Sequence, residues 1–548
     1  MDEKIYYVCK YTPLELLAGF GLEAKRLDPA PVSFECADGC AHPNLCGYGK
    51  AVIEEVTKRG IKRLLLVDCC DVCRRVFDVL SQRGDMEFLF LMALPHKNDS
   101  AEIRLLGAEF IRLRCVLMNL TGRQFDMQSA LRAWRDGAEN VRQQEISEQH
   151  IRFTGAHGGT LLLNTIRAHS PLPVLDDTCT GRRELPSPGE HTGTFSADYA
   201  AALLNQRRAC MRMQFRAEEP DKNAAGLICH TVKFCDYYGF QYRQLKSERS
   251  VPLLKIETDC TAQSSGQLRT RIDAFSETLR PKSAPTIRGS KHYFAGVDSG
   301  SASTDAVILD AERRIISSAI LPTGAGAASG AEKALKAALE QAGLTRDDLA
   351  AVVTTGYGRE TVGLSDTSIT EITCHARGAH FLYPDTRTVI DIGGQDSKVI
   401  RLDAEGNVVN FVMNDKCAAG TGRFLEMMAR TLQLSLKDMS ELGLKWKNEV
   451  AISSMCTVFA ESEVVSLIAE NTPPADIVRG LNMAVAAKTS ALVRRLGGEP
   501  AYVMTGGVAQ NRGVVRALEE KLGEPIHVPE EAQLCGALGA ALFALGRN

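Results

Sequence analysis

The chain has 548 residues, of which 45% are hydrophobic and 24% are charged, and its formal net charge is −3 at pH 7. This length predicts two to four domains, and this composition is ordinary for a soluble globular protein. The charge gives no basis for nucleic acid or an anionic membrane as a partner. No run reaches about 18 apolar residues, and the first residues, MDEKIYYVCKYT, are not a signal peptide, so we expect a cytoplasmic protein.

Cysteine is unevenly distributed along the chain. There are 17 cysteines, of which thirteen precede residue 261 and four follow residue 373. In a reducing cytoplasm they are not expected to form disulfides, so the asymmetry predicts two units with different chemistry. The segment TLRPKSAPTIRGSKH (278–292) follows a helical pattern and precedes a strand, and its prolines, serines and glycine predict a linker. We therefore expect a first domain at 1–280, a linker at 281–291 and a second domain at 292–548.

In the first half, apolar runs of strand type alternate with helical stretches; the runs span residues 63–68, 87–95, 172–177, 224–230 and 252–259. The segment 124–168 is expected to be helical. This rhythm is typical of Rossmann-like α/β subdomains, in which helices cover a parallel sheet and sites lie at the carboxyl ends of the strands. The cysteines fall at those ends, and they outnumber the four ligands of a structural zinc site. We therefore interpret the first half as an iron–sulfur domain.

In the second half, predicted helices lie near 329–343 and at the carboxyl end, and predicted strands lie at 294–310, 349–359, 388–403 and 501–511. Two aspartate–glycine turns, DSGSAST and DIGGQD, follow apolar runs about 93 residues apart. Glycines in such turns let backbone N–H groups approach phosphate oxygens closely. Together the two turns predict a duplicated sheet unit that closes on a nucleotide from two sides.

Candidate residues for ATP chemistry follow from these turns. Asp298, Asp391 and Gln395 are the candidate catalytic residues, and the two aspartates are expected to orient Mg²⁺ and the attacking water. One glycine-rich turn alone is weak evidence, but a third turn, at Gly506 and Gly507, follows the first two. Three such turns in this order favour ATP binding, and the third would leave room for adenosine. The expected nucleotide-binding residues are Gly300, Ser301, Ser303, Thr304, Gly393, Gly394, Asp396, Gly420, Gly422, Glu461, Gly506, Gly507 and Asn511.

Residues 292–548 contain the sequences GVDSGSASTDAV, TTGYGR, EITCHARGA, DIGGQDSK, NDKCAAGTGRFLE, CTVFAESEV and TGGVAQN. They resemble the BadF/BadG/BcrA/BcrD-type activator ATPases of the 2-hydroxyacyl-CoA dehydratase and benzoyl-CoA reductase systems. That resemblance implies the duplicated α/β fold of the ASKHA superfamily, which includes acetate and sugar kinases, Hsc70 and actin, with ATP and Mg²⁺ as ligands. One departure is Asp305, where such proteins often carry a lysine.

In the same family, one cysteine from each of two motifs binds iron, and the matching residues here are Cys417 and Cys456. A 4Fe–4S cluster takes four thiolates, so the resemblance implies one cluster shared by two chains, and hence a homodimer. The alternative is two buried free cysteines. Cys374 and Cys535 are expected to be packing residues, and His375 to make a structural hydrogen bond. A sugar kinase, which needs a carboxylate base and a sugar pocket, is the lesser interpretation.

The first half contains HPNLC, CDVCRRVFD, DDTCTGRRE, HTVKFCDYYGFQY and ETDCTAQSSGQLRTRIDAF, which resemble the D-component subunits of 2-hydroxyacyl-CoA dehydratases and the related double-cubane cluster proteins. The dehydratase subunits hold a 4Fe–4S cluster with three cysteines, matched here by Cys46, Cys70 and Cys235. The double-cubane (8Fe–9S) proteins use six cysteines. For that case the expected ligands are Cys40, Cys46, Cys70, Cys73, Cys229 and Cys235, with Cys36 and Cys260 as replacements. Both cluster types remain open.

The remaining first-half cysteines are expected to have other roles. Cys9, Cys115 and Cys210 lie in helical or strand settings without partners, and Cys69 is less suited as a ligand because it adjoins Cys70. Cys179 stands in a family motif with charged neighbours that could shape the site without binding metal, namely Asp176, Asp177, Arg182 and Arg183.

The two resemblances together imply an ATP-dependent low-potential reductase. Ferredoxin or flavodoxin would reduce the shared cluster, ATP hydrolysis would drive the electron to the first-half cluster, and a small molecule would be reduced there. One alternative is a self-activating 2-hydroxyacyl-CoA dehydratase, whose second subunit would be a separate chain. Another is an ATP-gated electron carrier for a different enzyme. A symmetric homodimer with two cluster-bearing units favours the double-cubane type.

Overall fold

The computed structural model divides the chain into two compact units, Met1–Ile272 and Asp273–Asn548. Within the described part of the chain, no helix combines the length and apolar character needed to span a membrane. The predicted linker lies outside the described residues. The structure describes every residue except 1–2, 144–147, 190–193, 207–209, 214–220, 249–250, 263–265, 281–291, 325, 361–362, 364, 415–417, 453–456 and 547–548.

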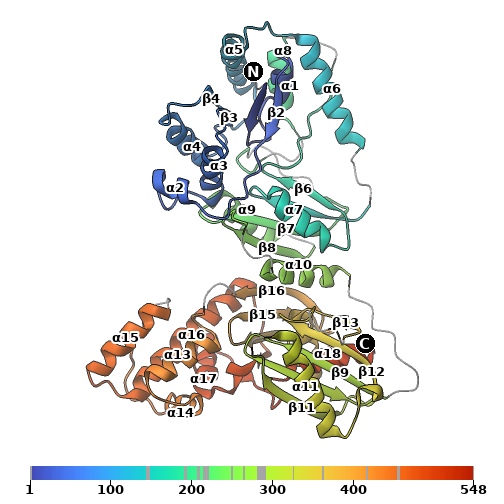
Figure 1. Cartoon of the computed structure of the whole chain (residues 1–548), viewed down its shortest axis with the longest axis vertical. Coiled ribbons are helices and arrows are strands. Elements are labelled where there is room, and N and C mark those ends of the chain that lie inside the picture. Colours follow the sequence, from blue (N-terminus) through green and yellow to red (C-terminus); the bar gives the residue numbers. More distant parts are fainter. Residues whose placement is uncertain are drawn as a thin grey trace. The chain divides into compact units, whose positions relative to one another are not determined.

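The first unit contains two parallel four-stranded sheets. The first has the order β2 (Glu23–Arg26), β1 (Lys4–Tyr7), β3 (Arg63–Val67) and β4 (Phe88–Met92). Strand β3, RLLLV, is apolar on both faces because helices cover both sides of such a sheet. Helices α4 and α5 both pack against β4 (Figure 1). The helices of this part are α1 (Leu14–Ala18), α2 (Glu35–Cys40), α3 (Gly47–Lys58), α4 (Asp71–Ser81), α5 (Ser100–Thr121), α6 (Met127–Gln143) and α8 (Phe195–Leu204).

The second sheet of this unit has the order β6 (Val174–Thr178), β5 (His150–Gly155), β7 (Ala224–Val232) and β8 (Leu253–Thr258). Helices α7 (Gly159–Ala168) and α9 (Asp236–Glu248) pack against β6 and β7. The expectation that 124–168 is helical was wrong at β5, which separates two helices. The strand contains Arg152, which is buried because its Nε donates to Asp177 Oδ2 at 2.8 Å. A long-range ion pair of this kind is not visible in a local sequence pattern.

The second unit contains two five-stranded sheets of identical order, which confirms the predicted duplication. In the first sheet the order is β11 (Ile315–Pro322), β10 (Ser303–Leu309), β9 (Tyr293–Ser299), β12 (Leu349–Gly356) and β13 (Thr367–Ser368). In the second it is β16 (Val408–Asn414), β15 (Ser397–Leu402), β14 (Thr388–Ile392), β17 (Tyr502–Thr505) and β18 (Ile526–His527). The segments predicted as single strands at 294–310 and 388–403 are hairpins, each folded at its glycine turn.

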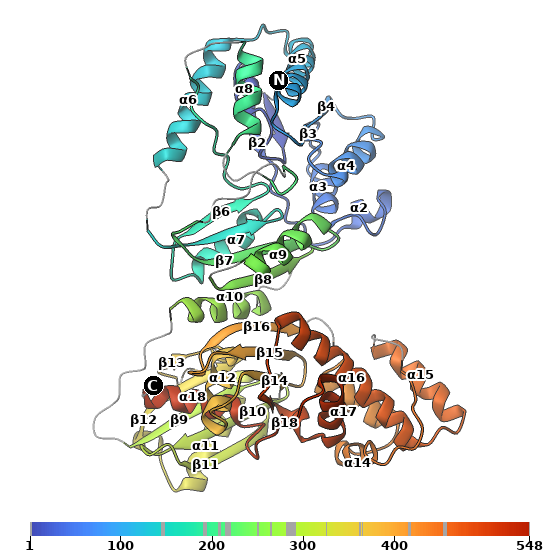
Figure 2. The same ribbon diagram turned by 180° about the vertical axis from the view of Figure 1, so that it is seen from behind.

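Two helices lie between these sheets (Figure 2). Helix α18 (Cys535–Leu545) packs on β9, β10 and β12, and α12 (Glu371–Leu382) packs on α18 and on β14–β17. Small residues permit this contact: a Cβ on Gly296 would lie 2.0 Å from the Ala537 carbonyl oxygen, and one on Gly539 would lie 1.9 Å from that of Cys374. The other helices are α11 (Ala327–Ala342), α13 (Gly422–Thr431), α14 (Leu436–Leu442), α15 (Thr457–Ala469), α16 (Pro474–Leu496) and α17 (Arg512–Leu522), with short 3₁₀ turns at Arg346–Asp348 and Gly507–Gln510.

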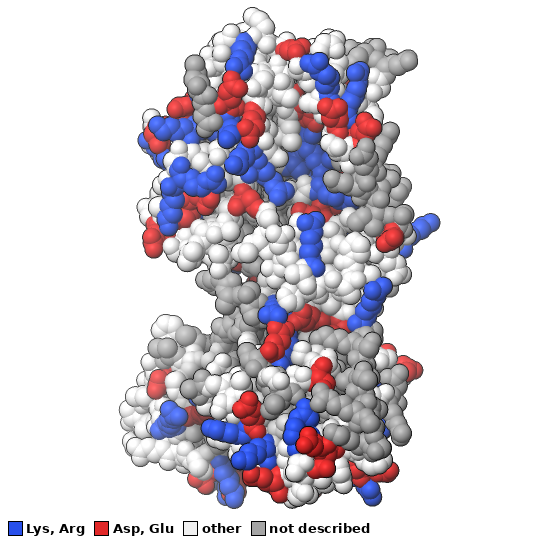
Figure 3. All heavy atoms as spheres, turned by 45° about the vertical axis from the view of Figure 1, so that its right-hand side comes forward, with Lys and Arg blue, Asp and Glu red and all other residues white. Residues whose placement is uncertain are grey.

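Helix α10 (Gly266–Leu279) begins in the first unit and ends in the second. Its last turns carry two acidic residues that are held within the second unit. Asp273 accepts a hydrogen bond from Arg359 at 2.6 Å, and Glu277 accepts from the backbone N–H of Thr370 at 3.1 Å. The end of α10 is therefore part of the second unit's packing. On the face shown in Figure 3, side chains of both signs occur on each unit, in keeping with the small net charge.

Candidate functional site

The two aspartate–glycine turns of the second unit lie against each other. A Cβ on Gly394, in the turn after β14, would lie 2.8 Å from the Cβ of Ala302, in the turn after β9. Helix α13 begins at the same place, because the N–H groups of Gly422 and Arg423 donate to the carbonyls of Gly393 and Gly394 at 2.9 and 2.8 Å. Two turns and a helix N-terminus thus meet, and such backbone suits phosphate groups.

The third predicted turn, at Gly506, joins this centre. Gly506 has a φ of 83°, and a Cβ there would lie 2.6 Å from the Ile392 carbonyl oxygen and 2.7 Å from Asp391 Oδ1. Only glycine combines this backbone conformation with this approach. The end of β17 is therefore held directly against the end of β14, as a nucleotide site built from three turns requires.

Two buried aspartates flank His375 of α12. Its Nε2 lies 3.7 Å from Asp298 Oδ2 on β9, and its Nδ1 lies 3.6 Å from Asp391 Oδ1 on β14. Thr505 Oγ1 lies 3.1 Å from Nδ1 of His375 and donates to Asp391 Oδ1 at 3.1 Å. The histidine therefore makes structural contacts, as predicted, and it connects the two sheets through their two aspartates.

The two aspartates differ in their affinity for a proton. Burial raises the pKa of Asp298. Burial acts in the same direction on Asp391, but His375 and Lys398 outweigh it, so the pKa of Asp391 is lowered. Two carboxyls whose environments separate their pKa values are suited to different roles in acid–base chemistry. Asp391 therefore holds its negative charge more readily than Asp298, and it is the better candidate to orient an attacking water.

Lys398 of β15 is a site residue that sequence reasoning missed. Its Nζ donates to Asp396 Oδ1 at 2.8 Å and to Asp391 Oδ2 at 3.2 Å, and it lies 3.5 Å from Glu371 Oε1. Burial would lower its pKa, but these three carboxylates raise the pKa well above the ordinary value for lysine. Burial raises the pKa of Glu371 to about 8. A lysine inside the apolar strand SKVIRL was the available signal, because a buried charge needs partners.

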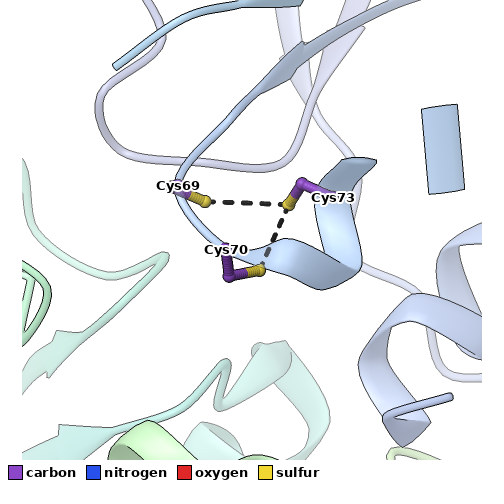
Figure 4. A group of neighbouring side chains, drawn as sticks. All are labelled: Cys69, Cys70 and Cys73. Carbon is purple, nitrogen blue, oxygen red and sulfur yellow. Dashed lines mark hydrogen bonds between the residues drawn. The ribbon is translucent and has the colours of Figure 1, made fainter. Parts of the chain in front are cut away.

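In the first unit, three thiols lie together where β3 meets α4 (Figure 4). Cys69 and Cys70 follow the strand, and Cys73 lies in the first turn of the helix. The Sγ atom of Cys73 lies 3.7 Å from that of Cys69 and 3.5 Å from that of Cys70. The sulfur atoms all lie within 4.8 Å of one another, so this corner can present several thiolates to one inorganic group.

Further thiols gather around this corner from the carboxyl ends of other strands and from helix starts. Cys46 directly precedes α3, and Cys235 directly precedes α9. Burial raises the pKa of Cys235 to about 12, and the neighbouring Cys46 and Cys70 act in the same direction. Cys46 also shares an apolar cluster with Tyr238 and several cysteines. We call the whole set the thiol group; it comprises Cys9, Cys46, Cys69, Cys70, Cys73, Cys179, Cys210, Cys235 and Cys260.

Comparisons with known proteins match both halves of the chain. The family model for the BadF/BadG/BcrA/BcrD ATPase family matches residues 295–544. The 2-hydroxyisocaproyl-CoA dehydratase activator of Clostridioides difficile is 48% identical over 252 residues, which are 46% of this chain and 94% of that protein. The activator of lactoyl-CoA dehydratase of Anaerotignum propionicum is 49% identical over 252 residues, 46% of this chain and 97% of that protein.

The chain belongs to the BadF/BadG/BcrA/BcrD ATPase family. It is a fusion, because the model of the 2-hydroxyglutaryl-CoA dehydratase D-component matches residues 9–148 and 150–279. Among solved structures, component A of the (R)-2-hydroxyglutaryl-CoA dehydratase of Acidaminococcus fermentans is 47% identical, with a TM-score of 0.45, over 46% of this chain and 98% of that chain. The two family models together confirm the predicted fusion of a D-component unit with an ATPase unit.

Several predicted nucleotide-binding residues of the ATPase unit have structural partners. The hydroxyl of Thr304 lies 2.9 Å from that of Thr323, on the strand face opposite to its neighbour Asp305. Asn511 caps α17, since its side chain accepts from the Val514 N–H at 3.1 Å. Glu461 accepts from Thr431 at 3.2 Å. These contacts give Thr304, Asn511 and Glu461 structural roles that do not depend on a nucleotide.

The other predicted residues of the ATPase unit lie on the turns themselves. Gln395, Ser301 and Gly507 are exposed, and Gly300 is half-buried. Ser303 Oγ accepts from Gln533 at 3.3 Å. Gly420, with a φ of 90°, lies against the side chain of Lys488, just before α13. Cys374 and Cys535 are fully buried packing residues, as predicted. The predicted iron ligands Cys417 and Cys456 lie outside the described residues.

The D-component unit brings together four of its six predicted ligands, Cys46, Cys70, Cys73 and Cys235, but not the other two. Cys40 is exposed on α2, where its Sγ contacts the Cys36 carbonyl oxygen at 3.2 Å. Cys229 is fully buried within β7, in an apolar cluster with Leu227 and Leu253 that contains none of the other thiols. Cys229 lies inside β7, three residues before the strand ends at Val232, whereas Cys179 and Cys260 follow the ends of β6 and β8.

The structure instead places Cys179, Cys210 and Cys260 in the thiol group. Cys9 and Cys210, expected to stand without partners, are members of it, which corrects that expectation. Cys260 follows β8 with a φ of 64°, and burial raises its pKa, with Cys46 adding to the shift. Cys210 Sγ lies 3.2 Å from the hydroxyl of Tyr238. Chain order hid these neighbours, because they come from different strands.

Asp177, Arg182 and Arg183 of DDTCTGRRE are held in ion pairs, and Asp176 accepts from the Thr178 hydroxyl at 2.6 Å, which accords with a shaping role. Asp177 accepts from Arg152 at 2.8 Å and from Arg182 at 2.7 Å. Arg183 donates to Glu15 Oε2 at 2.7 Å, and both side chains are largely buried. These pairs connect the loop that carries Cys179 to strand β5 and to helix α1. They fix the loop without providing metal ligands.

Proposed function

We propose that the protein is an ATP-dependent low-potential reductase, in which ATP hydrolysis in the ATPase unit drives electron transfer to the D-component unit, where a small molecule is reduced. The observation that carries this proposal is the presence in one chain of a paired-aspartate nucleotide centre, Asp298 with Asp391, and of a buried group of thiols. An ATPase alone has no need of the second feature. A plain iron–sulfur protein has no need of the first.

The thiol group fits an iron–sulfur cluster by the chemistry of its donors. Cys46, Cys70, Cys73 and Cys235 would bind iron as predicted, with Cys179 and Cys260 within the same cluster of side chains. Clusters of this kind supply one-electron transfer at low potential when bound. The side chains of Tyr48 and Tyr238 line the group and would limit access of water. The number of thiols favours the double-cubane type over a single cluster on three cysteines.

A homodimer with a shared 4Fe–4S cluster is the proposed assembly, with ferredoxin or flavodoxin as the electron donor. Helix α15 begins directly after Cys456, at the edge of the ATPase unit (Figure 1). Three large apolar side chains on it are exposed: Phe459 to 65%, Val465 to 52% and Ile468 to 42%. A second copy that packs against this helix would cover these side chains.

Replacing Phe459 by aspartate tests this assembly. The variant should sediment as a monomer while the wild-type protein sediments as a dimer, because a charge on the covered face opposes association. Val528→Asp is a matched control, since Val528 is also an exposed apolar residue of the ATPase unit but lies away from α15. If the Phe459→Asp variant and the Val528→Asp variant both remain dimers, α15 is not the contact surface.

Helix α10 provides a route by which nucleotide binding could affect the D-component unit. The carboxylate of Glu277 accepts from the hydroxyls of Thr370 and Thr373 at 2.5 and 2.6 Å, at the start of α12. Helix α12 also carries Glu371 and His375, which contact the aspartates and Lys398. A nucleotide that prefers one arrangement of α12 therefore also favours one placement of the end of α10.

Glu277→Ala should destabilise the ATPase unit by about 2–3 kcal/mol, because Thr370 and Thr373 lose a charged acceptor in a buried place. The measurement is the thermal unfolding midpoint of the ATPase unit, which is identified as the transition whose midpoint rises when nucleotide is added. Thr278→Ala, one residue along the same helix, is the control and should change the midpoint little. An unchanged midpoint for Glu277→Ala would contradict the anchoring of α10.

Iron and sulfide analysis of the anaerobically purified protein tests the proposed function. We expect more than about four iron atoms per dimer, since one shared cluster accounts for only four. About four would remove the cluster of the D-component unit. Turnover of an acyl-CoA with a second co-purifying subunit would instead favour a self-activating dehydratase. ATP hydrolysis without reduction of any small molecule would favour an electron carrier.

A further inference from the structure

Asp305 of β10 faces Asp298 across a hairpin. The two residues are directly paired in the antiparallel register of β9 and β10, so their side chains emerge on the same face. The next residue back, Thr304, points to the other face, where its hydroxyl meets Thr323. Asp305 also lies three residues after Ala302, which belongs to the glycine turn expected to hold phosphate. A second carboxyl thus stands at the edge of the nucleotide centre.

This carboxyl is buried without a compensating cation. Asp305 is 5% exposed, its Oδ2 accepts only a long hydrogen bond of 3.4 Å from Ser303, and its Oδ1 has no hydrogen-bond partner among the described residues. The cations of the centre contact other acids: Lys398 pairs with Asp391, Asp396 and Glu371, and His375 lies between Asp298 and Asp391. Burial and Asp298 raise the pKa of Asp305 to about 8.

Two carboxyls that face each other beside a phosphate site do not readily both ionise, because the two negative charges would repel each other and the nucleotide. A cation that both carboxylates coordinate removes both repulsions, because it can also accept a phosphate oxygen as a ligand. Hard divalent cations such as Mg²⁺ and Mn²⁺ prefer carboxylate and phosphate oxygens. The unpartnered Oδ1 supplies the additional ligand atom.

We propose that Asp305 and Asp298 together bind a divalent metal ion, and that this ion, not a protein side chain, meets the nucleotide at the first glycine turn. The proposal rests on the nucleotide site of the proposed function and adds a ligand to it. It also implies that the ATPase unit has affinity for a divalent cation before nucleotide arrives, since both carboxylates are in place without one.

Mn²⁺ alone is the probe, titrated into nucleotide-free holoprotein, with free Mn²⁺ measured from its room-temperature EPR signal. The wild type should bind one tight Mn²⁺ per chain, and Asp305→Asn should bind it about 10- to 100-fold more weakly. Glu312→Gln, an exposed acid that follows β10, should match the wild type. Equal Mn²⁺ affinity of Asp305→Asn and the wild type would overturn the proposal.

A second measurement covers the case in which Asp305→Asn folds poorly. At saturating ATP, the Mg²⁺ concentration that gives half the maximal ATPase rate should rise several-fold in Asp305→Ser, whose thermal midpoint is checked in parallel. An unchanged Mg²⁺ requirement in a folded variant would contradict the metal site while leaving the proposed function intact. A wild-type protein without ATPase activity at any divalent concentration would remove the proposed function itself.

Discussion

Asp391→Asn is expected to lower the maximal ATPase rate by about 10²–10⁴-fold, the range in which a positioned general base contributes. Asp391 is the carboxyl of the centre with the lowered pKa, and it contacts His375, Lys398 and Thr505 at once. Asparagine keeps the shape and removes the negative charge. Lys398 keeps Asp396 and Glu371 as partners, so the fold should be retained. The measurement is ATP hydrolysis under saturating Mg²⁺.

Asp385→Asn is the matched control, because Asp385 is an exposed acid shortly before the same strand, β14. Its ATPase rate should equal that of the wild type. Iron content should be unchanged in both variants, since the thiol group belongs to the D-component unit. An Asp391→Asn protein that hydrolyses ATP within a few-fold of the wild-type rate would show that another group activates the water.

The second large effect is expected at the thiol group. Cys70→Ser should lose the iron of the D-component unit and abolish small-molecule reduction while ATP hydrolysis continues. Cys70 is a predicted ligand at the N-terminus of α4, with its Sγ 3.5 Å from that of Cys73. A serine oxygen is a poor substitute for a thiolate toward iron. Iron analysis and ATPase assays on the same preparation separate the two outcomes.

A pair of alanine variants sharpens this test. Cys260→Ala should lose iron, because Cys260 belongs to the thiol group, and Cys229→Ala should keep it, because Cys229 packs with Leu227 and Leu253. Cys229 is fully buried and Cys260 is half-buried. Loss of iron in Cys229→Ala with full iron in Cys260→Ala would restore the ligand set expected from sequence.

Much of the fold could be predicted from sequence because its signals are local. Apolar runs such as RLLLV mark buried parallel strands, and the repeated aspartate–glycine turns revealed the duplication of the ATPase unit. Strand β5 was missed because its buried Arg152 depends on Asp177, which follows on the next strand of the sheet. A charged residue in a sequence segment predicts an exposed position unless its ion-pair partner is known.

The sites were predicted less completely, for the same physical reason. Glycine turns can be recognised from the sequence alone, and the structure brings Gly394 against Ala302 and Gly506 against Asp391. Lys398 was overlooked because its role depends on three carboxylates from β14, the following turn and α12. Among the cysteines, spacing along the chain suggested Cys229, whereas the sheet brings Cys260 to the other thiols. Ligand sets depend on which strand ends meet, and spacing does not determine that.

The account depends on nucleotide controlling electron transfer between two iron sites in one chain. The most direct test is EPR of the anaerobic, dithionite-reduced protein, recorded with Mg²⁺–ATP and with Mg²⁺–ADP. We expect a signal that requires ATP, that is absent from Cys70→Ser, and that does not develop in Asp391→Asn. Identical spectra with ATP and ADP, or a preparation without iron, would contradict the account.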